Sequence, residues 1–152
     1  MKLTKRGEYG LKALLALSMV YGKKTLSLRE ISFRERLPVK FLEQIMMTLK
    51  RARLVESVKG KHGGYSLARA PEKITLGEVI RVVDGPLAPI ATAEEIERRI
   101  QRDDCHPGLY SVLLDVRNAI SEILDHKSLA DICTKSLELS HSRGTTRQMY
   151  YI

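Results

Sequence analysis

A short glycine-rich stretch at residues 58–68, VKGKHGGYSLA, carries the first cluster of side chains that could do chemistry. It holds Lys59, Lys61 and His62 among three glycines, so it offers positive charge on a backbone that can turn sharply. A Gly-rich turn between two extended segments is typical of a β-hairpin tip. Cations on a narrow tip suit the negative potential of a DNA minor groove, although the same features also describe a flexible surface hairpin.

The second cluster lies on a helix predicted after Pro38. Apolar residues recur there at i, i+3, i+4 and i+7, which predicts a buried face made by Leu42, Ile45, Met46 and Leu49. The opposite face then carries polar and mostly cationic side chains, namely Lys40, Glu43, Gln44, Met47, Lys50 and Arg51. The major groove of B-form DNA accepts a helix, so such a face can read base edges while its cations hold phosphates.

Positive charge is concentrated in the half of the chain that holds both clusters. The 152 residues carry a formal net charge of +8. Residues 1–70 hold 16 Lys and Arg against 5 Asp and Glu, whereas residues 71–152 hold 10 against 13. This asymmetry is typical of a polyanion-binding module joined to a nearly neutral one, since phosphate neutralisation supplies much of the affinity for nucleic acids. A basic surface that is merely solvated is the alternative.

Three helices and a hairpin would position the two clusters. Residues 4–21 are strongly apolar, lack proline and end at Gly22, which predicts a buried helix. Ser27 and Glu30 fit a capping box that starts a second helix to about Arg36, and the third helix follows from Pro38 to about residue 53. The extended pair LVESV and YSLAR comes next. This order predicts a mostly α fold with a small β-hairpin wing, a winged helix-turn-helix domain over residues 1–85.

The second half predicts a sensor region and a dimerisation helix. A helix capped by Thr75 closes near Gly85, and residues 86–108 form a polar loop or sensor region in which residues 92–95 can start a short helix. Further on, apolar side chains are spaced 4, 3, 4, 3 as in a coiled-coil seam: Leu109, Leu113, Val116, Ile120 and Ile123. We expect this helix to pack on a symmetry mate, with burial in its own subunit as the alternative. With a short C-terminal helix it spans residues 109–133, and residues 134–152 are predicted to form a flexible tail or to reach a partner.

Four segments of the sequence resemble the IscR-like family of bacterial winged helix-turn-helix transcriptional regulators, which includes iron-sulfur, nitric-oxide and cysteine-metabolism sensing repressors. They are MKLTKRGEYGLKALLAL at the start, FLEQI in the third helix, LVESVKGKHGGYSLA across the wing and TLGEVIRVVDG after it. The resemblance implies a homodimer that sets each third helix in a major groove of double-stranded DNA and each wing against the adjacent minor groove. It also implies that Glu43 and Gln44 meet bases. Lys40 and Phe41 would reach the groove near the helix start, unless Phe41 belongs to the core.

An iron-sulfur cluster is a further implication of the resemblance, because many family members hold one on three cysteines ahead of the dimerisation helix. This chain has two cysteines, and only Cys105 stands at a matching place. Some relatives complete the site with a carboxylate near the N-terminus and a histidine, which implies a mixed site of Glu8, Cys105 and His106, with Cys133 as a fourth ligand. In the ordinary alternatives Glu8 pairs with a lysine, His106 caps a helix and Cys133 fills apolar space. No cofactor is certain from the sequence.

Together these patterns favour a homodimeric, sequence-specific DNA-binding transcriptional regulator. We expect a repressor that reads a pseudo-palindromic operator and responds to redox, iron-sulfur or metabolite status, through an effector or partner protein that the sequence does not identify. A winged-helix module that binds another protein without specific DNA binding is the alternative. An enzyme is not expected, because the wing glycines match neither G-x-G-x-x-G nor the P-loop pattern. No apolar run approaches the roughly 18 to 20 residues of a membrane span, and the start lacks a signal-peptide core, so we expect a cytoplasmic protein.

Overall fold

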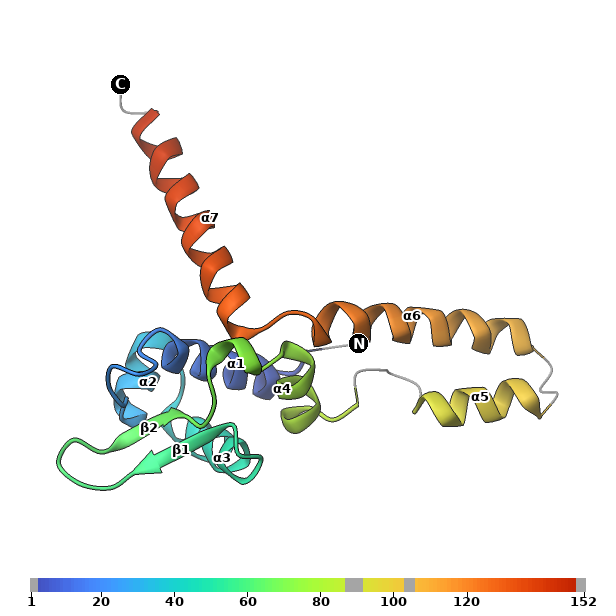
Figure 1. Cartoon of the computed structure of the whole chain (residues 1–152), viewed down its shortest axis with the longest axis horizontal. Helices are drawn as coiled ribbons and strands as arrows, with labels where there is room; N and C mark the ends of the chain where they lie inside the picture. Colours follow the sequence, from blue (N-terminus) through green and yellow to red (C-terminus); the bar gives the residue numbers. More distant parts are fainter. Residues whose placement is uncertain (1–2, 87–91, 103–105, 150–152) are drawn as a thin grey trace.

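The computed structural model describes residues 3–86, 92–102 and 106–149, with side chains described as far as residue 143. Its elements are, in order, α1 (Lys5–Ser18), α2 (Leu28–Glu35), α3 (Val39–Arg51), β1 (Val55–Val58), β2 (Gly64–Leu67), η1 (Pro71–Lys73), α4 (Leu76–Val83), α5 (Ala93–Gln101), α6 (Pro107–Asp125) and α7 (Leu129–Met149). Figure 1 shows α1 to α4 and the hairpin gathered into one head, from which α5 and α6 project to one side and α7 to another. The head is the winged helix-turn-helix that the element order predicts.

α1 supplies the centre of the hydrophobic core. The Thr4 side chain accepts a hydrogen bond from Gly7 N at 3.1 Å and so starts the helix. The inner face of α1 is buried through Leu14 and Leu17, and the helix contacts α2, α3, α4 and α7. This central position means that every other part of the head is placed relative to α1.

α2 and α3 are held by their ends and by one apolar face. The predicted capping box is present, since Ser27 N donates to Glu30 Oε2 at 2.7 Å and Glu30 N donates to Ser27 Oγ at 3.2 Å. The four predicted core positions of α3 are all buried: Leu42, Ile45, Met46 and Leu49. α3 ends at Arg51, two residues earlier than predicted, because Arg53 adopts a left-handed φ of +57° and turns the chain toward β1.

β1 and β2 form the two-stranded antiparallel wing. Their register pairs Val55 with Leu67 and Val58 with Gly64. Leu26 forms an isolated antiparallel β-bridge with Tyr65. Leu26 N donates to Tyr65 O at 3.0 Å and Tyr65 N donates to Leu26 O at 2.7 Å. The tip-proximal half of β2 is therefore fixed to the segment that leads into α2.

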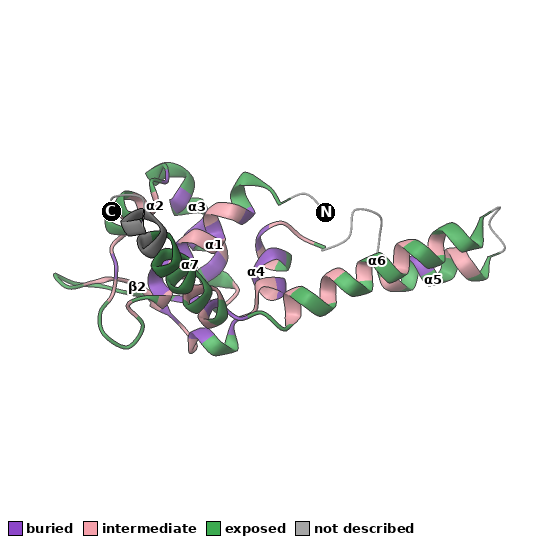
Figure 2. Ribbon diagram, turned by 90° about the horizontal axis from the view of Figure 1, so that it is seen from above, coloured by how far each residue is buried: buried purple, intermediate pink, exposed green. Residues whose placement is uncertain are grey.

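α5 and α6 lie side by side in both views (Figures 1 and 2). Ile96 on α5 is buried, and the Arg99 guanidinium sits over the Tyr110 ring of α6, 5.7 Å from its centroid. No residue of the 19-residue α6 is buried. The contacts of α6 within its own chain therefore leave every one of its side chains at least partly exposed.

The C-terminal segment differs from the prediction of a short helix followed by a flexible tail. α7 is one helix of 21 residues that extends to Met149. It starts with Ser128 as a cap, since Asp131 N donates to Ser128 Oγ at 3.1 Å. Two hydroxyls along it bond within the helix, from Ser136 to Ile132 O at 2.8 Å and from Ser140 to Ser136 O at 2.8 Å. The segment is polar and lacks the apolar periodicity by which a helix is predicted from sequence. No helix in the described residues is long and apolar enough to cross a membrane.

Candidate nucleic-acid interface

The outer side of α3 carries the helical residues that the sequence assigns to DNA binding. All seven side chains of this α3 face are exposed: Lys40, Phe41, Glu43, Gln44, Met47, Lys50 and Arg51. Glu43 is the only anion among three cations. The α3 face is therefore continuous, solvent-facing and net positive, which is the surface that a major groove requires.

The wing tip presents Lys59, Lys61 and His62, which are also exposed. A turn supports them, in which Gly63 N donates to Gly60 O at 3.0 Å and Gly60 has a φ of +116° that favours glycine. Thr25 Oγ1 donates to His62 O at 3.0 Å and ties the tip back to the head. The conformation of the tip is thus fixed by a hydrogen-bonded turn and by its bond to Thr25.

A direct bond joins the α3 face to the wing. Lys50 Nζ donates to Ser57 Oγ of β1 at 2.5 Å, and α3 and β1 are neighbours in the head (Figure 1). Lys50 of the α3 face therefore contacts the strand that leads to the wing tip.

Arg6 of α1 adds a cation beside the α3 face, although the sequence did not predict it. Its Nη2 donates to Thr48 Oγ1 at 2.7 Å, and the Thr48 hydroxyl also lies 3.1 Å from Gln44 O. Arg6 is exposed and brings a further cation from the first turn of α1 to the side of Gln44. The Lys-Arg pair at the start of the helix was the available signal, but nothing in its spacing points to α3.

Phe41 falls between the two roles considered for it. Its ring makes an edge contact with Tyr9 of α1, with centroids 5.6 Å apart and planes at 86°. The side chain is still 39% exposed. Phe41 therefore braces the start of α3 against α1 and leaves part of its ring free.

The predicted dimerisation residues, here called the α6 seam, face away from the core in the single chain. Leu109, Val116 and Ile123 are 55%, 51% and 62% exposed, and Leu113 and Ile120 are half-buried. Figure 2 shows the same helix without any buried segment. An apolar stripe this exposed marks an interaction surface.

The residues considered as metal ligands do not gather in the described part of the chain. Lys12 Nζ lies 2.8 Å from Glu8 Oε1 and holds the pKa of Glu8 below its usual value, so this carboxylate has an ordinary partner. His106 precedes α6 as its N-cap, at the end of that helix that lies away from α1 in both views, and makes no side-chain cap bond. Cys105 lies outside the described residues.

Cys133 sits in α7, where partial burial raises the pKa of its thiol. Among described residues no three His, Cys, Asp or Glu side chains come close enough to hold a metal ion. Iron-sulfur clusters are bound mainly by cysteine thiolates. One half-buried, protonated thiol in the described part of the chain does not fit such a cluster.

A helical head with a basic recognition helix and a basic wing defines a winged helix-turn-helix DNA-binding transcriptional regulator. The chain belongs to the Rrf2 family, described as "Iron-dependent Transcriptional regulator", which it matches over residues 3–135. Members of this family are regulators that bind DNA and act as dimers, not enzymes.

Individual relatives agree with this assignment. The chain is 34% identical over 134 residues to the HTH-type transcriptional regulator CymR of Bacillus subtilis, covering 88% of this chain and 91% of CymR. It is 35% identical over 136 residues to the HTH-type transcriptional regulator IscR of Sodalis glossinidius, covering 87% of this chain and 78% of that regulator. The solved structure of B. subtilis CymR, the global cysteine regulator, has a TM-score of 0.76 and 32% identity, over 89% of this chain and 98% of CymR.

Proposed function

We propose that this chain acts in the cytoplasm as a homodimeric repressor that occupies a pseudo-palindromic operator. Each protomer sets the α3 face in a major groove and the wing tip in the adjacent minor groove. The α6 seam pairs with the same seam of a second copy. Two heads then read half-sites separated by about one helical turn, roughly 34 Å.

The observation that carries the proposal is the contact between the exposed basic face of α3 and the strand that leads to the exposed basic wing tip, through Lys50 and Ser57. Within this surface, side chains divide by chemistry. Gln44 can form paired hydrogen bonds with an adenine edge, and Glu43 can accept from cytosine N4. The lysines and arginines suit phosphates, which position the protein without reading sequence.

A module that only binds protein is a weaker proposal for the same surface. Such a module has no need of exposed cations on both a helix and a hairpin tip, whereas DNA binding uses such cations to neutralise phosphates.

Selection from a random duplex library tests the proposal. We expect the wild-type protein to enrich a two-fold symmetric sequence. Gln44→Ala should weaken binding to that sequence by about 1–3 kcal/mol per base contact and leave binding to an unrelated duplex unchanged. Lys50→Ala should weaken binding to both duplexes alike, whereas Lys135→Ala on α7, an equal change of charge on another element, should affect neither.

Two outcomes would contradict the proposal. One is the absence of any symmetric consensus at low salt. The other is an equal loss for Gln44→Ala on both duplexes, because a base-reading residue must discriminate between sequences.

The signal to which the repressor responds is proposed to reach it without a three-cysteine cluster, because the chain has two cysteines. A shift in the relative pose of the two heads is enough to change affinity, since an effector needs only different affinities for two poses.

A further inference from the structure

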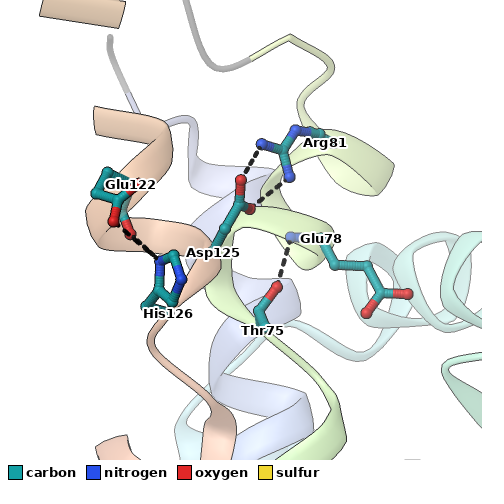
Figure 3. Close-up of polar contacts among 6 residues, drawn as sticks. All are labelled: Thr75, Glu78, Arg81, Glu122, Asp125 and His126. Atoms are coloured by element: carbon teal, nitrogen blue, oxygen red, sulfur yellow. Dashed lines mark hydrogen bonds and ion pairs between the residues drawn. The ribbon is translucent and has the colours of Figure 1, made fainter. Parts of the chain in front are cut away.

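α4 connects the DNA-binding surface to the helix that carries the α6 seam. At its first turn, Arg69 Nη2 pairs with Glu78 Oε1 at 2.5 Å, and Arg69 lies two residues beyond the end of β2. One turn later, Arg81 pairs with Asp125, the last residue of α6 (Figure 3). One helix of eight residues therefore binds the segment that follows the wing on one side and α6 on the other.

The pair between Arg81 and Asp125 is bidentate. Arg81 Nη1 donates to Asp125 Oδ1 and Arg81 Nη2 donates to Asp125 Oδ2, each at 2.7 Å. A planar guanidinium on a planar carboxylate fixes direction as well as distance. Asp125 is thereby held in one orientation relative to the α4 axis.

The absence of a side chain at Gly77 lets the Asp125 carboxylate come close to α4. A Cβ at residue 77 would lie 2.0 Å from Asp125 Oδ1, well inside contact distance. Glycine within a helix costs about 1 kcal/mol relative to alanine. The position is explained by the carboxylate of α6, which occupies the space that any other side chain would need.

The backbone supplies a second attachment just beyond α6. Leu76 N donates to Lys127 O at 2.8 Å, and Leu129 N donates to Ile74 O at 2.9 Å. These two bonds form one short antiparallel bridge between Thr75 and Ser128. The bidentate pair adds a side-chain attachment at the last residue of α6, so the end of this helix is held to α4 by both backbone and side-chain bonds.

We propose that Arg81, Asp125 and Gly77 are positioning residues that set the angle at which α6 leaves the head, and so the spacing of the two DNA-reading surfaces in the dimer. This inference rests on the proposed function, because it needs dimerisation through the α6 seam. The consequence is that the protein measures the distance between half-sites through a contact that touches neither DNA nor the dimer partner.

Double electron–electron resonance on the free dimer tests, without DNA, whether these residues fix the position of the two heads relative to each other. A nitroxide on Arg29→Cys, on the exposed side of α2, reports the distance between heads in a background of Cys105→Ser and Cys133→Ala. We expect the width of the distance distribution to increase at least about twofold in Asp125→Asn and in Gly77→Ala. Glu122→Gln is the matched control, because Glu122 lies on the same helix and its carboxylate lies 3.7 Å from His126 Nδ1, not against the head. Equal widths in wild type and Asp125→Asn would overturn the proposal.

A spacing series gives the functional readout. The selected duplex is compared with versions in which the half-sites are one base pair closer or farther, and with a duplex holding a single half-site. Wild type should prefer one spacing. Asp125→Asn should bind that spacing about 5- to 10-fold more weakly, through a lower effective concentration of the second head, while its affinity for the single half-site stays unchanged.

Arg81→Lys, which keeps the charge but not the paired geometry, should fall between wild type and Asp125→Asn. An equal loss on the single half-site would show general damage to the head and would overturn the positioning role. If wild type binds no duplex, the proposed function fails, whereas the distance measurement still decides the geometry. Should Gly77→Ala not fold, Asp125→Asn, which preserves the shape of the side chain, carries the test.

Discussion

Replacing Lys61 with alanine isolates the contribution of the wing tip to DNA binding. Lys61 is exposed, so its truncation removes no buried side chain. The head should fold with unchanged stability, because surface substitutions of this kind stay within about 0.5 kcal/mol. Any loss of DNA affinity then belongs to the lost charge.

The size of the effect follows from the number of phosphates released. One lysine per protomer means two contacts per dimer, and each contact contributes about 0.9 to the slope of log K against log salt. The slope should therefore become less steep by about 1.8, and the affinity at about 0.1 M salt should fall roughly 60-fold. Fluorescence anisotropy of a labelled duplex over a series of salt concentrations measures both quantities.

Lys135→Ala removes the same charge from α7 and serves as the control. Its slope should match that of wild type. A Lys61→Ala slope equal to that of wild type would refute the placement of the wing tip on DNA. A drop in affinity at all salt concentrations without a change of slope would do the same, since it would point to a contact that is not with phosphate.

Three further predictions concern the rest of the chain. Val116→Asp should give a monomer by sedimentation. Val116 is exposed in the single chain, so the introduced carboxylate would be desolvated only when two α6 seams pack together. Asn118→Asp on the same helix is the control and should stay dimeric. Cys133 should react with a disulfide reagent more slowly than a free thiol at neutral pH, and faster as pH rises, because burial raises the pKa of its thiol and keeps it protonated. Protein purified anaerobically should lack iron-sulfur absorption and stoichiometric iron; a full complement of either would contradict the fit of the ligands.

Local sequence signals predicted the parts of the fold that local chemistry decides. The apolar spacing of α3 named its buried face, and Ser27 and Thr75 were recognised as helix caps from the residues three positions beyond them. These signals act within one or two turns. The winged helix-turn-helix is confirmed, whereas the DNA contacts and the α6 seam remain predictions.

The contacts that the sequence did not predict join residues far apart in the chain. Arg6 and Thr48 are separated by 42 positions, and Arg81 and Asp125 by 44. No spacing rule links such pairs, because they depend on how α1, α3, α4 and α6 pack. The extent of α7 was missed for a different reason: its sequence is polar and has no apolar periodicity to detect.

Methylation protection on the selected duplex tests the central claim most directly. Dimethyl sulfate reaches guanine N7 in the major groove and adenine N3 in the minor groove, so one experiment reports both grooves. With each protein at a concentration that saturates the duplex, we expect protection of guanine N7 in two segments about one helical turn apart and of adenine N3 beside each, with the adenine protection lost in Lys61→Ala. Protection confined to one groove, or guanine protection lost together with that of adenine in Lys61→Ala, would contradict the account.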